Sequence, residues 1–208
     1  GSGIEAQRWD FGRSYGHGPL DIYHSKHVIV WGRNVSRTNM HLYHHLQQVK
    51  KKGATLTVID PIFNPTAKLA DRYISVKPGM DGWLAAGVLK ILCQTGRTDS
   101  DFIQRHSVGF EEIEKFLQTI SIEEIIEKTE TSLEVIEYLA DLYADGPAST
   151  FMGLGMQRYK NGGGTIRWID ALAAASGNVG IKGGGANFGN VQVGESFAKA
   201  ELTRPDLK

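Results

Sequence analysis

The sequence predicts a doubly wound α/β fold, with a mainly parallel sheet and helices on both faces of that sheet. Four short segments, at 27–31, 55–59, 73–76 and 149–153, are mostly continuous runs of apolar residues. Stretches with helical spacing of apolar residues lie between them. Parallel strands that are buried on both faces show such runs, and parallel strands need long crossover connections, usually helices.

The composition is that of an ordinary soluble protein large enough for a real core. The chain has 208 residues, with 23 Lys and Arg against 23 Asp and Glu, and a hydrophobic fraction of 41%. A nucleic-acid or membrane-surface binder needs a basic excess, which is missing here. No apolar run approaches the roughly 20 residues that cross a bilayer. The single cysteine, Cys93, excludes an internal disulfide and a cysteine-based metal site within this chain.

The first half predicts alternating strands and helices. Residues 1–24 are polar and glycine-rich, so we expect an ordered loop there. Cations in the last turn and a following glycine mark the end of the first helix. The expected elements after the loop are a strand at 27–31, a helix at 38–52 with Thr38 as its N-cap, a strand at 55–59, a helical turn at 65–69 and a strand at 73–76.

The second half predicts one long helix, several short ones and a further strand and helix. Asp81 stands where an N-cap would begin the long helix, which runs to Gln94. Ser121 and Glu124 have capping-box spacing. The remaining expected elements are short helices near 100–106, 110–118, 121–128 and 131–144, a strand at 149–153, a helix at 165–176 and a glycine-rich tail from 183.

Distinctive polar and glycine residues follow each predicted strand. In open parallel sheets, ligands bind outside the carboxyl ends of the strands, so we expect these segments to meet along one edge. The segments are Gly32-Arg33-Asn34, Asp60-Pro61, Lys77-Pro78-Gly79-Met80-Asp81 and Gly153-Leu154-Gly155.

Three of these residues have both a binding and a structural interpretation. Asp60 follows the second strand, where nucleotide-binding folds place an acid against ribose hydroxyls, although a strand-end turn would also explain it. Asn34 can donate and accept hydrogen bonds at once, and Gly32 permits close approach of a ligand to the backbone. Asp81 is explained by an N-cap or by recognition of the guanine edge, which offers two donors to a carboxylate.

Several other motifs lack the context that catalysis requires. Gly12-Arg13-Ser14-Tyr15-Gly16 matches GxSxG, but no strand precedes it and no helix follows. The pair Gly153-x-Gly155 lacks the third glycine of a dinucleotide fingerprint, because Arg158 stands there. His41 and His45 have no HExxH context. Without a nucleophile or an acid–base pair, the sequence favours a binding domain over a complete enzyme.

The ordered set of motifs resembles the molybdopterin oxidoreductase family, the superfamily of dimethyl-sulfoxide reductase, formate dehydrogenase and nitrate reductase. The resemblance covers nearly the whole chain, and each motif alone is weak. Its motifs are Trp31-Gly32-Arg33-Asn34, Ile59-Asp60-Pro61, Lys77-Pro78-Gly79-Met80-Asp81-Gly82, Gly153-Leu154-Gly155-Met156-Gln157-Arg158 and Ser176-Gly177-Asn178-Val179-Gly180.

The resemblance implies that the chain binds one guanine dinucleotide half of a bis-pterin cofactor that carries molybdenum or tungsten. The fold would then be Rossmann-like. Asp60 would face the ribose and Asp81 the guanine, while Gly155, Met156 and Gln157 would lie nearer the pterin. The cofactor-binding residues implied are Gly32, Asn34, Asp60, Pro61, Pro78, Gly79, Asp81, Gly155, Met156 and Gln157. No catalytic or metal-ligating residue of this chain is implied.

The resemblance also implies a larger parent. We expect residues 1–24 to belong to a neighbouring domain, 25–182 to form the dinucleotide-binding domain and 183–208 to lead to another domain, with both ends mobile or rearranged in isolation. The parent would carry an iron–sulfur cluster in a preceding region and contact an iron–sulfur electron-transfer subunit, but neither nucleic acid nor a membrane. Its compartment, cytoplasm or periplasm of a prokaryote, stays open.

Two alternatives compete with this assignment. The central domain of a thiamine-diphosphate enzyme also has a parallel sheet and a strand-end acid, but it lacks the Ser176–Gly180 motif. Another nucleotide-binding α/β module, such as an NAD-binding protein, would need a glycine fingerprint after the first strand, and this chain has none.

Overall fold

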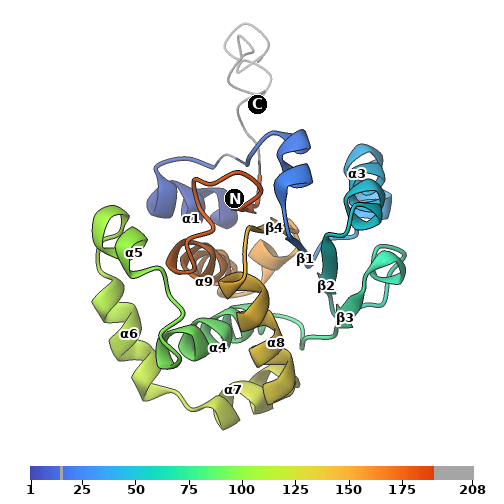
Figure 1. The fold of residues 1–208 in the computed structure, drawn as a ribbon. Coiled ribbons are helices and arrows are strands. Elements are labelled where there is room, and N and C mark those ends of the chain that lie inside the picture. Colours follow the sequence, from blue (N-terminus) through green and yellow to red (C-terminus); the bar gives the residue numbers. More distant parts are fainter. Residues whose placement is uncertain (15, 190–208) are drawn as a thin grey trace, which may run out of the picture.

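A five-stranded, all-parallel sheet forms the centre of the molecule (Figure 1). The computed structural model describes residues 1–14 and 16–189. The strands follow one another in the order β3-β2-β1-β4-β5, which confirms the predicted fold class. This order reverses direction between β1 and β4, the position where such sheets open a ligand crevice. The strands are β1 His27–Trp31, β2 Thr55–Ile59, β3 Arg72–Ile74, β4 Ala148–Met152 and β5 Gly185–Asn187.

Helices cover both faces of the sheet. Nine α-helices and three 3-10 helices occur in the part of the chain that the structure describes. They are α1 Ser2–Phe11, α2 Val35–Thr38, α3 Met40–Lys51, α4 Asp81–Gln94, α5 Ser100–His106, α6 Phe110–Thr119, α7 Ile122–Thr129, α8 Leu133–Ala144 and α9 Gly162–Ala175, with η1 Pro19–His24, η2 Ala67–Leu69 and η3 Met156–Arg158.

Alternate residues of β1 enter two separate hydrophobic cores. Ile29 and Trp31 point into the larger core, which α4, α8 and α9 complete. Val28 and Val30 point into the smaller core, which α3 and η1 complete. All four side chains are fully buried. Because both faces of the strand are buried, β1 has the continuous apolar sequence that the prediction relied on.

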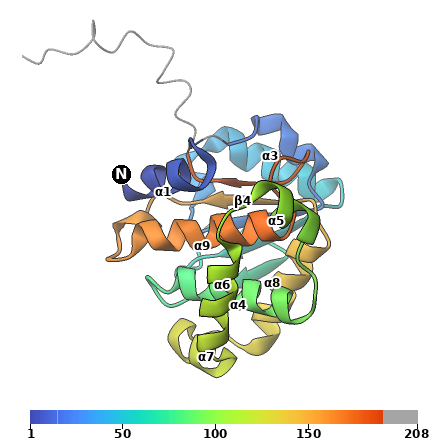
Figure 2. The same ribbon diagram turned by 90° about the vertical axis from the view of Figure 1, so that its left-hand side faces the viewer.

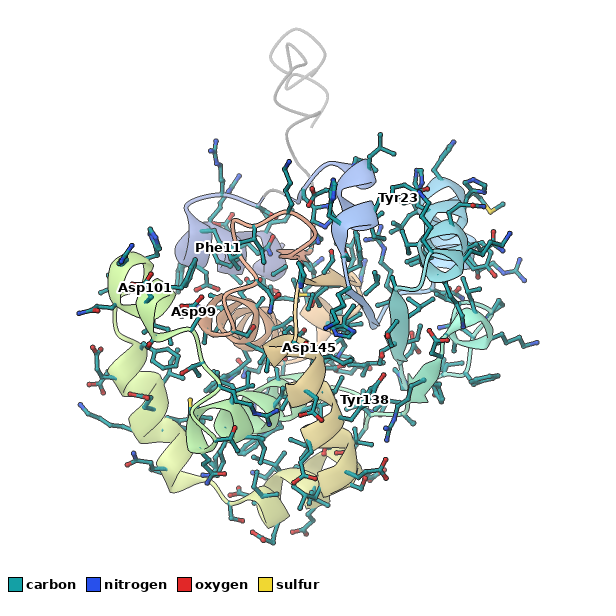
Figure 3. All side chains as sticks on the ribbon, viewed as in Figure 1. Phe11, Tyr23, Asp99, Asp101, Tyr138 and Asp145 are labelled. Carbon is teal, nitrogen blue, oxygen red and sulfur yellow. The ribbon has the colours of Figure 1, made fainter. Side chains whose placement is uncertain are left out.

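The short helices of the second half form an outer layer. Figures 1 and 2 show α5, α6 and α7 curving around α4 and α9 on the side away from α3. Asp99, which Figure 3 labels between α5 and α9, caps α5 by accepting from Phe102 N at 2.8 Å. Its own backbone N–H donates to Ala175 O at 2.7 Å, so this residue ties the layer to the end of α9.

The prediction of a loop over residues 1–24 was wrong. Most of this segment is helical, with α1 and η1 joined by a short connection. Helix α1 packs against α9 and buries Gly3, Ala6 and Gln7 (Figure 1). These small and polar residues do not form a recognisable apolar stripe, so the helix left no signal in the sequence.

The glycine-rich tail contributes an unpredicted strand. β5 pairs in parallel with β4, with Ser149 opposite Gly185 and Phe151 opposite Asn187. Its three residues, Gly-Ala-Asn, contain no apolar run. They form a strand because they hydrogen-bond to β4. The rest of the tail, from 190 to 208, lies outside the described residues, as does the expectation that it is mobile.

Several element boundaries also differ from the prediction. Asn39, not Thr38, caps α3, accepting from Leu42 N at 3.0 Å. Asp81 is the first residue of α4 and makes no side-chain cap. α9 begins at Gly162 rather than 165, since its three glycines already adopt the helix. The short helices and the Ser121 cap, which accepts from Glu124 N at 3.0 Å, are confirmed.

Candidate functional site at the carboxyl edge of the sheet

The loops after β1 and β4 touch at the crevice between these two strands. A side-chain carbon added to Gly153 would lie 1.7 Å from Gly32 O, so the two backbones are in direct contact. Gly32 has a φ of 61°, which favours glycine. Gly32 N donates to Ile59 O at 2.7 Å, and Gly153 N donates to Trp31 O at 2.8 Å. Glycine at both positions therefore brings the two loops together where a ligand would enter.

Asp60 holds the loop that follows β2. Its Oδ1 accepts from Ile62 N at 2.8 Å and its Oδ2 accepts from Asn64 Nδ2 at 3.1 Å. The residue is only 8% exposed, and burial raises the pKa of its carboxyl against the effect of these two donors. Each carboxylate oxygen keeps a second lone pair that a ligand hydroxyl can use.

Asn34 links the first two of these loops. Its Oδ1 accepts from Ser36 Oγ at 2.8 Å and from Thr66 Oγ1 at 3.3 Å. Ser36 N in turn donates to Thr66 Oγ1 at 3.0 Å. The Nδ2 group of Asn34 donates to no residue that the structure describes. The amide is thus fixed in orientation and still has donors for a ligand.

Asp81 is buried at the start of α4, with 4% of its surface exposed. Its Oδ1 accepts from Trp31 Nε1 at 2.9 Å. Burial raises the pKa of the Asp81 carboxyl, and the nearby charge of Asp60 adds to this. The two predicted acids are therefore close enough to interact, as the shared edge requires.

The remaining predicted residues lie in the same loops. Met156 packs on Gly32, whose added side-chain carbon would lie 3.0 Å from Met156 Cγ. The ring of Tyr159 covers Gly79, which has a φ of 81°. Met156 itself is 4% exposed, so it supports Gly32 from within the core. Pro61 and Pro78 are exposed at the same edge.

Gly155 and Gln157 differ in their surroundings. No atom lies within 4 Å of a side-chain carbon added to Gly155, so this position is open. Gln157 is held by the start of α1: Gly3 N donates to its Oε1 at 3.1 Å, and Ser2 Oγ donates to its carbonyl oxygen at 3.0 Å. Its Nε2 group makes no hydrogen bond with the described part of the chain.

Arg33, Gly153 and Tyr159 belong to this site although they were not among the predicted binding residues. The Arg33 side chain forms no hydrogen bond or ion pair within the described ranges, and burial lowers the pKa of its guanidinium. A half-buried cation without a counter-charge suits an anionic ligand. Arg33 and Gly153 stood in the sequence motifs, but their contribution depends on contacts between loops that sequence does not show.

The chemistry of the site is that of binding. It offers carboxylates, an amide, a guanidinium and backbone exposed by glycines. No group of three or more His, Cys, Asp or Glu side chains that could hold a metal ion occurs among residues 1–14 and 16–189. Cys93 lies on α4, partly buried, and burial together with the charge of Glu114 raises the pKa of its thiol to about 11.

The fold and this edge define a doubly wound α/β domain with a candidate ligand site at the carboxyl ends of its strands, and comparison with known proteins names the family. The family model for molybdopterin oxidoreductase matches residues 5–206. The chain belongs to the molybdopterin oxidoreductase family, whose cofactor is a molybdopterin. The comparisons give no support to the thiamine-diphosphate alternative.

Curated relatives extend well beyond this chain. It is 83% identical over 208 residues to "Probable oxidoreductase YyaE" of Bacillus subtilis, and spans 31% of that protein. It is also 37% identical to "Probable oxidoreductase YoaE" of the same organism over 207 residues. That match covers 99% of this chain and 30% of the relative. The assimilatory nitrate reductase catalytic subunit of B. subtilis is 29% identical over 77% of this chain and 23% of the subunit.

A solved structure shares the fold. Acetylene hydratase from Pelobacter acetylenicus superposes with a TM-score of 0.78 and 24% sequence identity, over 87% of this chain and 25% of that one. Within the described residues, no helix combines the length and the apolar character that crossing a membrane requires.

Proposed function

We propose that this chain binds the guanine dinucleotide half of a molybdopterin guanine dinucleotide cofactor. The observation that carries the proposal is the meeting of four strand-end loops at the β1/β4 crevice, with Asp60, Asn34 and Arg33 presented from adjacent loops. Family membership supports the molybdopterin. The identity of the nucleotide, the presence of molybdenum or tungsten and the roles of the individual residues are part of the proposal.

The residues suit the parts of such a ligand. Asp60 accepts hydrogen bonds from ribose hydroxyls, the role of a strand-end acid in dinucleotide folds. Arg33 and the free Nδ2 group of Asn34 face the pyrophosphate as a cation and a donor. Asp81 accepts from the two donors of the guanine edge. Its burial makes that contact strong once formed, because unscreened hydrogen bonds to a charge are the stronger ones.

The other predicted residues shape the cradle. Gly32 and Gly79 keep side chains away from the ligand, Pro61 and Pro78 stiffen two loops, and Met156 supports Gly32 from below. Gly155 and Gln157 reach toward the pterin from the β4 loop. When bound, the cofactor would supply a molybdenum or tungsten centre for two-electron redox chemistry in the parent protein.

The parent would contain further parts. We propose that the remaining domains of the same subunit complete the cofactor site, that an iron–sulfur cluster lies in a preceding region, and that an iron–sulfur subunit exchanges electrons with it. The balanced charge of the chain gives no reason to expect nucleic acid or a membrane as a partner.

Isothermal titration calorimetry of the 208-residue chain with GDP, ADP and NAD tests the proposal. GDP is the probe because it carries the guanine, ribose and pyrophosphate of the ligand. Binding of GDP in preference to ADP and NAD supports it. Tighter binding of ADP or NAD, or equal affinity for all three nucleotides, contradicts guanine recognition at this edge.

A further inference from the structure

Two buried carboxyl groups face each other between α1 and α9, away from the proposed nucleotide site. Asp170 of α9 is 1% exposed, and the side chain of Asp10 on α1 is 15% exposed. Asp10 Oδ2 and Asp170 Oδ2 are both buried and accept from no donor among the described residues, and each carboxyl group shifts the pKa of the other. Two ionised carboxylates could not hydrogen-bond each other, because neither has a proton to donate.

The surrounding contacts favour Asp170 over Asp10 as the group that carries the proton. Arg167 Nε donates to Asp10 Oδ1 at 2.8 Å, so Asp10 is the ionised partner of an ion pair. Asp170 Oδ1 accepts from Gln7 Nε2 at 3.0 Å, and Asp170 forms no ion pair with any cation in the described part of the chain. A proton on Asp170 Oδ2 that points at Asp10 Oδ2 gives both orphaned oxygens a partner.

We propose that Asp10 and Asp170 share one proton and that this proton latches α1 onto α9. The polar neighbours support the latch from the other sides. Gln7 is fully buried and also donates to Ala186 O at 3.0 Å, while its Oε1 accepts from Ser14 Oγ at 2.7 Å. The same cluster thus joins α1, α9 and β5.

Arg167 and Tyr143 are the ionisable groups that interact with Asp10 or Asp170 in the described part of the chain. Asp10 lies on α1, Arg167 and Asp170 lie on α9, and Tyr143 of α8 lies near enough for the charge of Asp170 to act on it. Burial raises the pKa of Tyr143, so this hydroxyl stays protonated and leaves the proton of the pair in place. Burial and the charge of Asp10 raise the pKa of Asp170 well above the ordinary aspartate value, whereas Gln7 acts in the opposite direction.

The sign of the pH effect follows from linkage. A raised pKa in the docked state means that docking is strongest below the pKa of a free aspartate, about 4, and weakens as pH rises from there through the raised value. Above the raised value Asp170 is ionised in both the docked and the undocked state, so the docking equilibrium no longer changes with pH. One proton corresponds to about a tenfold change in the docking equilibrium per pH unit in that interval.

The latch has a consequence at the other end of α1. The start of this helix holds Gln157 through Ser2 Oγ and Gly3 N. Undocking of α1 would release Gln157, and the meaning of this for cofactor binding rests on the proposed function. The latch itself is measured without any nucleotide, so its failure is distinguishable from failure of that function.

Carbon-13 NMR of the aspartate carboxyl groups, with amide hydrogen exchange of α1 from pH 5 to 8, tests the proposal on the full chain. We expect the Asp170 resonance to titrate far above pH 4, and α1 protection factors to fall by about tenfold per pH unit within the interval. Asp170→Asn keeps the shape and offers an amide donor to Asp10, so its α1 protection should be independent of pH.

Asp141→Asn is the matched control. This aspartate lies on the surface in an ion pair with Arg97, so the substitution removes the same charge without touching the latch. It should keep the wild-type pH dependence. An Asp170 resonance that titrates near pH 4, or wild-type α1 protection that does not change with pH, overturns the proposal. The wild-type titration decides even if Asp170→Asn fails to fold.

Discussion

The indole Nε1 of Trp31 donates a hydrogen bond of 2.9 Å to Oδ1 of Asp81, joining the last residue of β1 to the first residue of α4. Trp31 is fully buried and Asp81 nearly so. The bond therefore fixes the Asp81 carboxyl group to the sheet, and it replaces the N-cap that the sequence predicts for Asp81.

Trp31→Phe should destabilise the fold by about 1–3 kcal/mol, because it leaves a buried carboxyl without its donor. Urea unfolding at neutral pH measures this. Asp81→Asn should cost less, since its amide oxygen still accepts from the indole. Equal losses for the two variants would mean that the hydrogen bond does not control the position of this side chain.

The raised pKa of Asp81 gives a second test by the same method. Stability from this group is full below about pH 4 and declines as pH rises through the raised value, because the folded state holds the proton more tightly. Asp81→Asn should remove that decline, so its stability relative to wild type should improve with rising pH. A constant difference across pH 4 to 8 would contradict the assignment.

Two glycines of the same loop should respond in opposite ways to alanine. Gly153→Ala places a carbon 1.7 Å from Gly32 O and should cost more than ~4 kcal/mol. Gly155→Ala meets open space at φ −63° and ψ −37°, and should stabilise by about 0.4–1 kcal/mol through the unfolded chain. Thermal and urea unfolding compare them. Similar stabilities would refute the close contact of the β1 and β4 loops.

Cys93 should be a poor nucleophile in the folded chain. With a pKa of about 11, only about one thiol in a thousand is ionised at pH 8, against roughly a quarter for an ordinary cysteine. Labelling with a thiol-reactive chromophore should be on the order of two hundredfold slower in native protein than in urea. Equal rates would show that the thiol is neither buried nor perturbed.

The fold was predictable where the local sequence shows an apolar run or a helix cap. β1 is an apolar run and β2 and β4 contain shorter ones, while α5, α7 and α8 begin at side-chain caps such as Ser121. α1 and β5 were not predictable, because their buried positions are occupied by residues such as Gly3, Gln7 and Asn187. Their structure depends on packing against α9 and β4.

The site was predictable in part for the same reason. Parallel topology alone brings Gly32, Asp60 and Gly79 to one edge, so counting strand ends finds the loops. Three features are relations between loops: the bond between Trp31 and Asp81, the packing of Tyr159 on Gly79, and the lack of a counter-charge for Arg33 among the described residues. Such contacts between loops can be found only in the three-dimensional structure.

Nucleotide affinity should depend on Asp60 and on pH. Asp60→Asn should weaken GDP binding by about tenfold, or ~1.4 kcal/mol, while the exposed Asp141→Asn leaves it unchanged. Because burial raises the pKa of Asp60 and the proposed ribose contact requires the carboxylate, binding should weaken as pH falls through that raised value, earlier than for an ordinary aspartate. Calorimetry at a series of pH values checks both; an unchanged affinity in Asp60→Asn excludes its ribose role.

NMR shift mapping of the isotope-labelled chain with GDP tests most directly whether the nucleotide lies at the carboxyl edge of the sheet. We predict shifts concentrated at Asn34, Asp60 and Asp81. At the opposite edge, a hollow of about 420 Å³ lies beside Asp145, labelled in Figure 3, and His27. Shifts confined to His27 and Asp145 would place the nucleotide there and contradict the assignment of this site.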